Sequence, residues 1–193
     1  MLDLQQENLP KNISAEELRS QGFVTFQHDL ETLQQFHQLA PSVIVKDDEK
    51  VIAYALTVVN EARHIFPPME SMFVLLETLQ WKGKSFHDFR YYEMGQICVA
   101  KDHRGKGVFE MLYQQHKKSY SHKFDLLVTQ ISTKNHRSLR AHKKVGFENA
   151  VVEKDELDEW VLVVWDWNDH YIHLLRNSLN SCRRLFMICS NCS

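Results

Sequence analysis

The residues whose types and spacing most clearly suggest chemistry form the stretch HRGKGVF, residues 103–109. This stretch follows an apolar segment and precedes a pattern typical of a helix. Two glycines and three basic side chains fall within five consecutive positions. Glycine weakens regular structure, so a turn with two of them indicates a place where bare main chain is needed.

A strand, a glycine-rich turn and a helix N-terminus together can bind an anion, because the first N–H groups of a helix lack partners within it. Gly105 and Gly107 would let the main chain approach the anion, and Arg104 and Lys106 would add positive charge. The pattern is not a P-loop, and Glu110 replaces the third glycine of the dinucleotide-binding motif. The residues therefore predict a phosphate or pyrophosphate site, with a surface turn that binds nothing as the alternative.

Hydrophobic periodicity predicts the elements that position this turn. A capping box at residues 14–17 opens a short helix, and Gly22 is placed to end it. Further helices are expected at 30–40, 69–79, 109–120 and 135–145, and strands at 43–45, 51–59, 93–100, 124–131 and 159–167. Alternating strands and helices in the second half favour an α/β sheet with helices on its faces.

Composition limits the class of protein. The 193 residues carry a formal charge of −2, so no overall basic field argues for nucleic acid. We find no signal peptide and no apolar run long enough to span a membrane. The four cysteines do not form a disulfide pattern, which favours a reduced, cytoplasmic protein.

Two segments are expected along the chain. Residues 1–168 would form one domain. Residues 169–193 break the pattern and would form either a helix for packing or homodimer formation, or a loosely ordered tail. A helix lying on a membrane surface is a weaker alternative.

Two motifs resemble those of the GCN5-related N-acetyltransferase (GNAT) family. In ICVAKDHRGKGVF, Arg104 and Gly107 match the family's acetyl-CoA motif, Gln/Arg-x-x-Gly-x-Gly/Ala, whereas Phe109 stands where Gly or Ala is usual. Downstream, NHRSLRAHKKVGFE, residues 135–148, is similar to the family's second motif, a helix opened by Asn and closed by Gly-Phe. The resemblance extends over residues 8–167 in the order of elements.

The resemblance implies an α/β fold with a mixed, splayed central β-sheet flanked by helices, and acetyl-CoA bound where two strands part. The pantetheine arm would pair with the main chain of Ile97 and Val99. Asn135 would lie near the end of the arm, or would serve only as an N-cap. The pyrophosphate would rest on the main-chain N–H groups of Arg104, Gly105, Lys106, Gly107, Val108 and Phe109.

The implied reaction is transfer of an acetyl group to a primary amine of a small molecule or peptide by direct attack. The N–H of Val99 could polarise the thioester carbonyl. His142 stands where the family often has a tyrosine, and either protonates the leaving thiolate or only packs. Glu93 is the candidate base, with Tyr92 or Gln96 ordering a water as the alternative.

A different function remains open, because Phe109, His142 and a short N-terminus depart from the family pattern. The chain would then be a catalytically inactive acyl-CoA-binding or sensory module. We expect no metal: the eleven histidines have no partners at ligand spacing, and the pair Cys189 and Cys192 is weak evidence for zinc. The apolar residues Phe66, Met69, Met72 and Phe73 could wall the acceptor pocket.

Overall fold

The structure is a computed structural model and describes residues 1–168. The tail predicted for residues 169–193, with Cys189 and Cys192, lies outside the described residues. The helices are α1 (Leu2–Glu7), α2 (Ala15–Ser20), α3 (Leu30–Leu39), α4 (Glu70–Thr78), α5 (Val108–Tyr120) and α6 (His136–Val145). The strands are β1 (Val43–Asp47), β2 (Lys50–Val58), β3 (Gln80–Trp81), β4 (Lys84–Ser85), β5 (Tyr91–Val99), β6 (Leu126–Ser132), β7 (Glu148–Lys154) and β8 (Glu159–Asp166).

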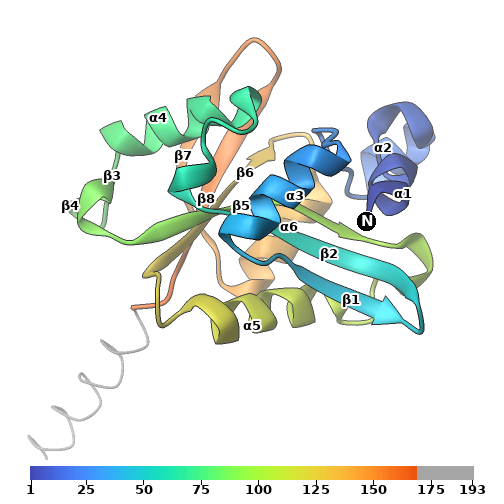
Figure 1. Cartoon of the computed structure of the whole chain (residues 1–193). Coiled ribbons are helices and arrows are strands. Elements are labelled where there is room, and N and C mark those ends of the chain that lie inside the picture. The colour runs from blue at the N-terminus through green and yellow to red at the C-terminus, as the bar shows by residue number, and fades with distance from the viewer. Residues whose placement is uncertain (169–193) are drawn as a thin grey trace, which may run out of the picture.

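Six strands form one mixed sheet in the order β1-β2-β5-β6-β8-β7, and β3 and β4 form a separate hairpin. The pair β5–β6 at the centre is parallel, and the other pairs are antiparallel. The predicted last strand, β8, lies between β6 and β7, which agrees with its two apolar faces. The prediction of a mixed sheet flanked by helices is confirmed (Figure 1).

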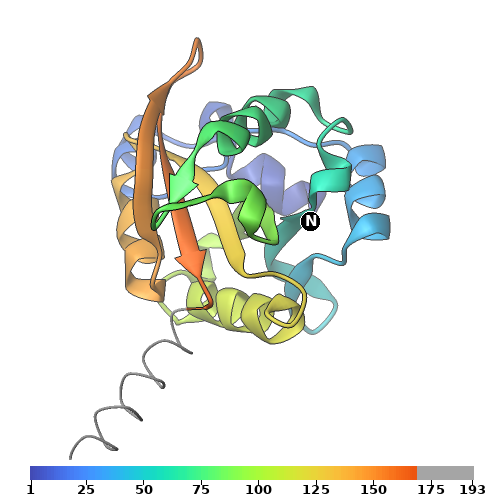
Figure 2. The ribbon, with the colours of Figure 1, turned by 90° about the vertical axis from the view of Figure 1, so that its left-hand side faces the viewer.

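Helices cover both faces of the sheet (Figures 1 and 2). On one face α5 and α6 pack against the strands, and Leu112 of α5 is fully buried in the largest apolar cluster. On the other face Met72 and Leu76 of α4 pack on β6 and β8. Beside them, Leu4 of α1 packs on β2 against Tyr54. The helical stripe predicted at residues 69–79 is therefore a packing surface on the sheet.

The central strands separate after a short paired segment. Residues 91–93 of β5 pair with residues 126–128 of β6, and beyond this point the two strands are not paired. A bulge at Gly95 and Gln96 of β5 bends the strand at this point, because these two residues lie opposite the single residue Leu56. A Cβ atom on Gly95 would lie 2.6 Å from Cγ2 of Val58, so the bulge needs glycine.

The predicted helices and strands are present to within a few residues at their ends, and the capping box at Ser14 is formed. The sequence missed the helix α1 at residues 2–7, the hairpin β3–β4 and the edge strand β7. Most side chains of β7 are exposed or only partly buried, so its sequence lacks the alternation that indicates a strand. No helix within residues 1–168 is long and apolar enough to cross a membrane.

Three histidines are buried in the core, namely His28, His116 and His142, and desolvation lowers the pKa of each to about 4. His28 is 1% exposed, and neither of its ring nitrogens has a partner among the described residues. Its ring packs edge-on against Phe36 and Phe66, with ring centroids 5.7 and 4.5 Å away. Between about pH 6.5 and pH 4, His28 therefore stays neutral in the folded protein, whereas the same side chain in the unfolded chain takes up a proton.

We expect His28→Leu to reduce the acid sensitivity of folding. Below the unfolded pKa of 6.5 the unfolded state binds a proton that the folded state excludes until about pH 4, so stability is lost as pH falls. Between pH 7.5 and 5.5 the wild type should lose about 1.4 kcal/mol more unfolding free energy than the variant, since all other titrating groups cancel in the difference. Urea unfolding at both pH values measures this, with the exposed His87→Gln as a control that should follow the wild type. Equal losses in wild type and His28→Leu would contradict the prediction.

Candidate functional site

The predicted anion turn lies between β5 and α5, as the sequence indicated. Gly105 and Gly107 have φ values of 73° and 80°, in the left-handed region, and Gly107 is the N-cap of α5. A Cβ at Gly107 would meet nothing within 4 Å, so the backbone conformation requires the glycine and crowding does not. The N-terminus of α5, with its unpaired N–H groups, therefore faces open space at the end of β5.

The free edge of β5 continues from this turn. The N–H of Ala100 donates to the carbonyl of Ile52 in β2, 2.8 Å away. Because polar main-chain groups alternate between the two edges of a strand, those of Ile97 and Val99 point away from β2, into the gap left by β6. Arg104 Nε donates to the carbonyl oxygen of Val99 there at 3.2 Å.

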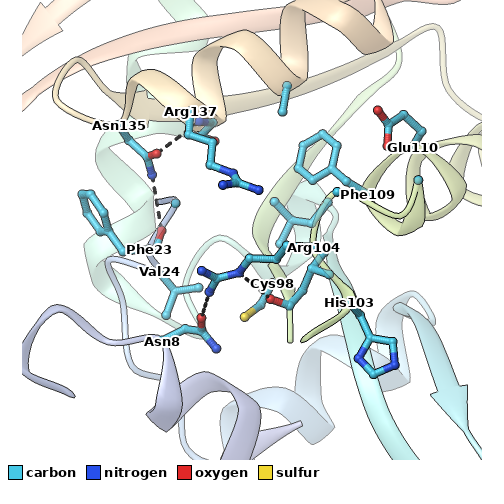
Figure 3. Close-up of a pocket in the computed structure, with 17 residues that line it drawn as sticks. Asn8, Phe23, Val24, Cys98, His103, Arg104, Phe109, Glu110, Asn135 and Arg137 are labelled. Carbon is cyan, nitrogen blue, oxygen red and sulfur yellow. Dashed lines mark hydrogen bonds between the residues drawn. The ribbon is translucent and has the colours of Figure 1, made fainter. Parts of the chain in front are cut away.

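A cavity of about 200 Å³ lies where the turn, the edge of β5 and the N-terminus of α6 meet (Figure 3). Of the residues predicted to bind the cofactor, it is lined by Ile97, Val99, Arg104, Gly105, Gly107, Phe109 and Asn135. Two predicted residues do not line it. Lys106 is exposed, and the side chain of Val108 is buried in the apolar core.

The N-terminal segment, residues 8–26, forms the opposite wall of this cavity, and the sequence did not predict that its residues line the cofactor cavity. Asn8 accepts a hydrogen bond from Arg104 (Figure 3). Gln21 accepts one from Arg137, which also lines the cavity. Both partners are neutral, so neither hydrogen bond cancels the positive charge of its guanidinium group. The cavity is thus suited to an anionic ligand.

Asn135 is the N-cap of α6, which was one of the two alternatives predicted for it. Its Oδ1 accepts from the N–H of Ser138 at 3.2 Å, as an N-cap of α6 does, and its Nδ2 donates to the carbonyl of Phe23 at 3.4 Å. It also lines the cavity. The cap therefore positions its amide between α6 and the N-terminal segment.

A second cavity, of about 90 Å³, adjoins the first on the side of β6 and α4. The two cavities share five lining residues, which are Phe23, Val24, Ile97, Asn135 and Ser138. Of the four residues predicted to wall an acceptor pocket, Met69 and Met72 line it and Phe66 and Phe73 do not. A ligand in the first cavity can therefore meet a second ligand at Ile97.

Glu93 lies in the second cavity, at the point where β5 and β6 separate. It is 5% exposed, and its Oε2 has no partner among the described residues. Desolvation raises the pKa of its carboxyl group to about 8. A carboxyl group with this pKa holds a proton up to about pH 8 and can accept one once it has ionised, so it could act as a general base at mildly alkaline pH.

The two residues that could instead order a water lie in different places. Gln96 lines the second cavity, accepts from the hydroxyl of Tyr54 at 2.5 Å and donates to the carbonyl of Phe26 at 2.7 Å. Tyr92 is buried, bonds His116 at 3.0 Å, and does not line the cavity. Gln96 also ties the N-terminal segment to β5.

His142 belongs to a buried network. Its Nδ1 lies 2.8 Å from the carbonyl oxygen of Ser138, to which it donates, so its Nε2 accepts from the hydroxyl of Tyr113 at 2.6 Å. With its pKa lowered to about 4 by burial, the ring is neutral at neutral pH. This arrangement favours the packing role of His142 over the proton donor, although its ring does line the second cavity.

The two residues that depart from the family motifs contact each other. The ring of Phe109 meets those of His142 and Tyr113 edge to face, each with centroids 5.1 Å apart. The bulky side chain at position 109 is therefore accommodated by the imidazole at position 142. Within residues 1–168 no group of three histidine, cysteine or acidic side chains gathers as metal ligands do.

Comparison with known proteins gives one family. A model of the acetyltransferase (GNAT) family matches residues 11–147. Naa20 of Chaetomium thermophilum, in complex with a bisubstrate analogue, is similar with a TM-score of 0.56 and 16% identity, covering 74% of this chain and 75% of that chain. The NatC complex bound to Gag peptide and CoA has a TM-score of 0.54 and 10% identity, covering 78% and 86%. The yncA structure from Salmonella typhimurium, with its cofactor acetyl-CoA, has a TM-score of 0.50 and 14% identity, covering 73% and 75%.

Because these identities lie between 10 and 16%, the likeness to the solved structures shows the fold alone, a mixed sheet flanked by helices. No curated protein sequence matches the chain.

We expect His142→Phe to destabilise the protein by about 1–3 kcal/mol, because it leaves the buried hydroxyl of Tyr113 without a partner. Tyr113→Phe should cost a similar amount by leaving Nε2 unpaired, and the double variant should cost less than the sum of the two. Chemical unfolding of the four proteins measures this coupling. Additive losses would mean that the His142–Tyr113 bond contributes nothing to stability.

Proposed function

Because this chain belongs to the acetyltransferase (GNAT) family, we propose that it transfers the acetyl group of acetyl-CoA to a primary amine by direct attack on the thioester. Family membership supports acetyl-CoA-dependent acyl transfer in general. The observation that carries the more specific proposal is the junction of the two cavities at Ile97. A cationic cavity meets there a smaller cavity that contains an unpartnered, buried carboxyl group.

In the proposed complex the pyrophosphate rests on the N–H groups at the start of α5, beside Arg104. The pantetheine arm pairs with the free edge of β5 at Ile97 and Val99, which positions the thioester at the junction of the cavities. The N–H of Val99 polarises the carbonyl oxygen, on which negative charge develops as the amine attacks.

Glu93 prepares the amine. An alkylammonium has a pKa near 10, so it must lose a proton before its nitrogen can attack. The carboxylate of Glu93 takes this proton, directly or through a water held by Gln96. The C–N bond then forms, the nitrogen releases its second proton to solvent, the C–S bond breaks, and the thiolate of CoA leaves and takes up a proton.

The donor of that last proton is a separate question. The sequence suggested His142, for which the His142→Phe protein provides the test. Loss of a general acid lowers kcat by roughly 100-fold or more, whereas a packing role leaves kcat of the folded variant within about tenfold. The neutral ring supports the second result.

The first prediction of this proposal concerns the cofactor. Gly107→Val should weaken CoA binding by about 1–3 kcal/mol, since the strained turn can no longer direct its N–H groups at the pyrophosphate. Gly83→Val is a matched control, because Gly83 has a φ of 81°, equally open surroundings, and a place in the β3–β4 turn away from both cavities. Calorimetry with CoA should show the loss in the first variant only. Unchanged affinity in folded Gly107→Val would refute the anion site.

The second prediction concerns the base. Glu93→Gln should lower kcat by roughly 100-fold or more, and should remove the rise in rate near pH 8 at which the carboxyl group ionises. Release of CoA thiol with an accepted amine, measured from pH 6 to 9, gives both quantities. The exposed Glu159→Gln serves as the control.

Stability provides an independent readout for the same variant. A raised pKa means that Glu93 contributes stability below pH 4.5 and that this contribution is lost as pH rises through about 8, so Glu93→Gln should be more stable than wild type at pH 8.

A stable Glu93→Gln protein with wild-type turnover would exclude Glu93 as the base. Tight CoA binding by the wild type without transfer to any amine would instead favour a CoA-binding module.

A further inference from the structure

The two cavities differ in charge. The cofactor cavity is lined by Arg104 and Arg137, with Glu110 as its one acidic residue. The acceptor cavity is lined by two acidic residues, Glu93 and Asp155, and the described residues that line it include no lysine or arginine. The acceptor side is therefore built for a positive group and against a negative one.

Glu93 is the buried acidic residue of the acceptor cavity. The carboxyl group is buried and its Oε2 has no partner, although buried polar atoms in folded proteins are nearly always paired. An ammonium group in the cavity would supply the missing partner and a compensating charge. Asp155 lies at the exposed rim, where it accepts from the N–H groups of Leu157 and Asp158 at 2.8 Å.

The remaining walls limit what the nitrogen can carry. Phe26 and Trp160 lie nearly parallel, with centroids 6.5 Å apart and an angle of 19° between their planes, and Met69 and Met72 line the cavity from η3 (Pro67–Met69) and α4. Uncharged polar side chains also line it, namely Thr25, Ser71, Gln96, Thr129, Gln130 and Ser132. These side chains suit a substrate with an apolar group and neutral polar atoms. None of them carries a positive charge that could pair with a substrate carboxylate.

We propose that the acceptor is an amine whose carbon next to the nitrogen carries an apolar group and no carboxylate. This rests on the proposed function, because it names the substrate class for the same site. The carboxylate of a free amino acid would lie next to that of Glu93, and the described residues that line the cavity include no lysine or arginine to pair it. Small arylalkylamines and polypeptide N-termini with an apolar first residue share the accepted chemistry.

A panel of matched amines tests this inference. Phenethylamine, phenylalaninamide and phenylalanine share the ring and the amine but carry hydrogen, a neutral amide or a carboxylate on the α-carbon. We expect kcat/KM to be at least about 30-fold lower for phenylalanine than for phenylalaninamide, because the carboxylate is desolvated without a cation to pair it. A tripeptide amide with N-terminal phenylalanine distinguishes the two sources: a higher kcat/KM than phenethylamine indicates a polypeptide, and a lower one a small amine.

A charge introduced at the rim provides a matched pair of variants. Ser71→Arg adds a cation beside the cavity and should raise kcat/KM for phenylalanine relative to phenylalaninamide by about tenfold. Val74→Arg lies on the same helix, exposed and away from the cavity, and should leave the ratio unchanged. An unchanged ratio in Ser71→Arg would count against the inference.

Binding of the same amines to the CoA-saturated protein, measured by calorimetry, separates failure of the inference from failure of the proposed function. Binding in the expected order without transfer supports the inference and overturns the proposed enzyme activity. Transfer to phenylalanine as fast as to phenylalaninamide overturns the inference and leaves the activity standing. Neither binding nor transfer of any amine overturns both.

Discussion

The pairing of β5 with β6 over only three residues is the constraint on which the rest of the structure depends. Beyond Glu93 the two strands diverge, and a bulge at Gly95 and Gln96 bends β5 at this point. The bulge needs glycine, because a side chain at position 95 would collide with Val58. The main-chain groups of β5 that face the gap have no strand partner there, and polar main-chain groups need partners. The same divergence leaves the carboxyl group of Glu93 at the fork, where it is buried without a hydrogen-bond partner for its Oε2.

The N-terminal segment closes the space that the diverging strands leave. Its main chain is held by Gln96, which donates to Phe26, and by Asn135, which donates to Phe23. It reaches the basic side of the site as well, where Asn8 contacts Arg104. The partner is a neutral amide, so the contact orders the guanidinium group without cancelling its charge. The segment thus contributes to both cavities although it contains no strand of the main sheet.

Burial has different consequences for the two ionisable groups of the site, because only one of them has all its polar atoms paired. Desolvation keeps His142 neutral, and its bonds to Ser138 and Tyr113 satisfy both ring nitrogens, so this side chain contributes to packing around Phe109. Desolvation also raises the pKa of Glu93 to about 8, but its Oε2 is unsatisfied, which is a cost in stability at neutral pH. A cost of this kind, at the junction of two cavities, is typical of a functional position.

The sequence by itself determined the local parts of this protein. Hydrophobic periodicity gave most helices and strands, and the glycines with Arg104 marked the turn between β5 and α5, because caps, turns and amphipathic faces depend on neighbouring residues. Only the tertiary structure decided that Asn8, Gln21 and Arg137 belong to the site, since these contacts join residues about a hundred positions apart. It also decided the protonation of Glu93 and His142, because desolvation depends on everything that surrounds a group in the fold, and the order of residues along the chain does not specify that surrounding.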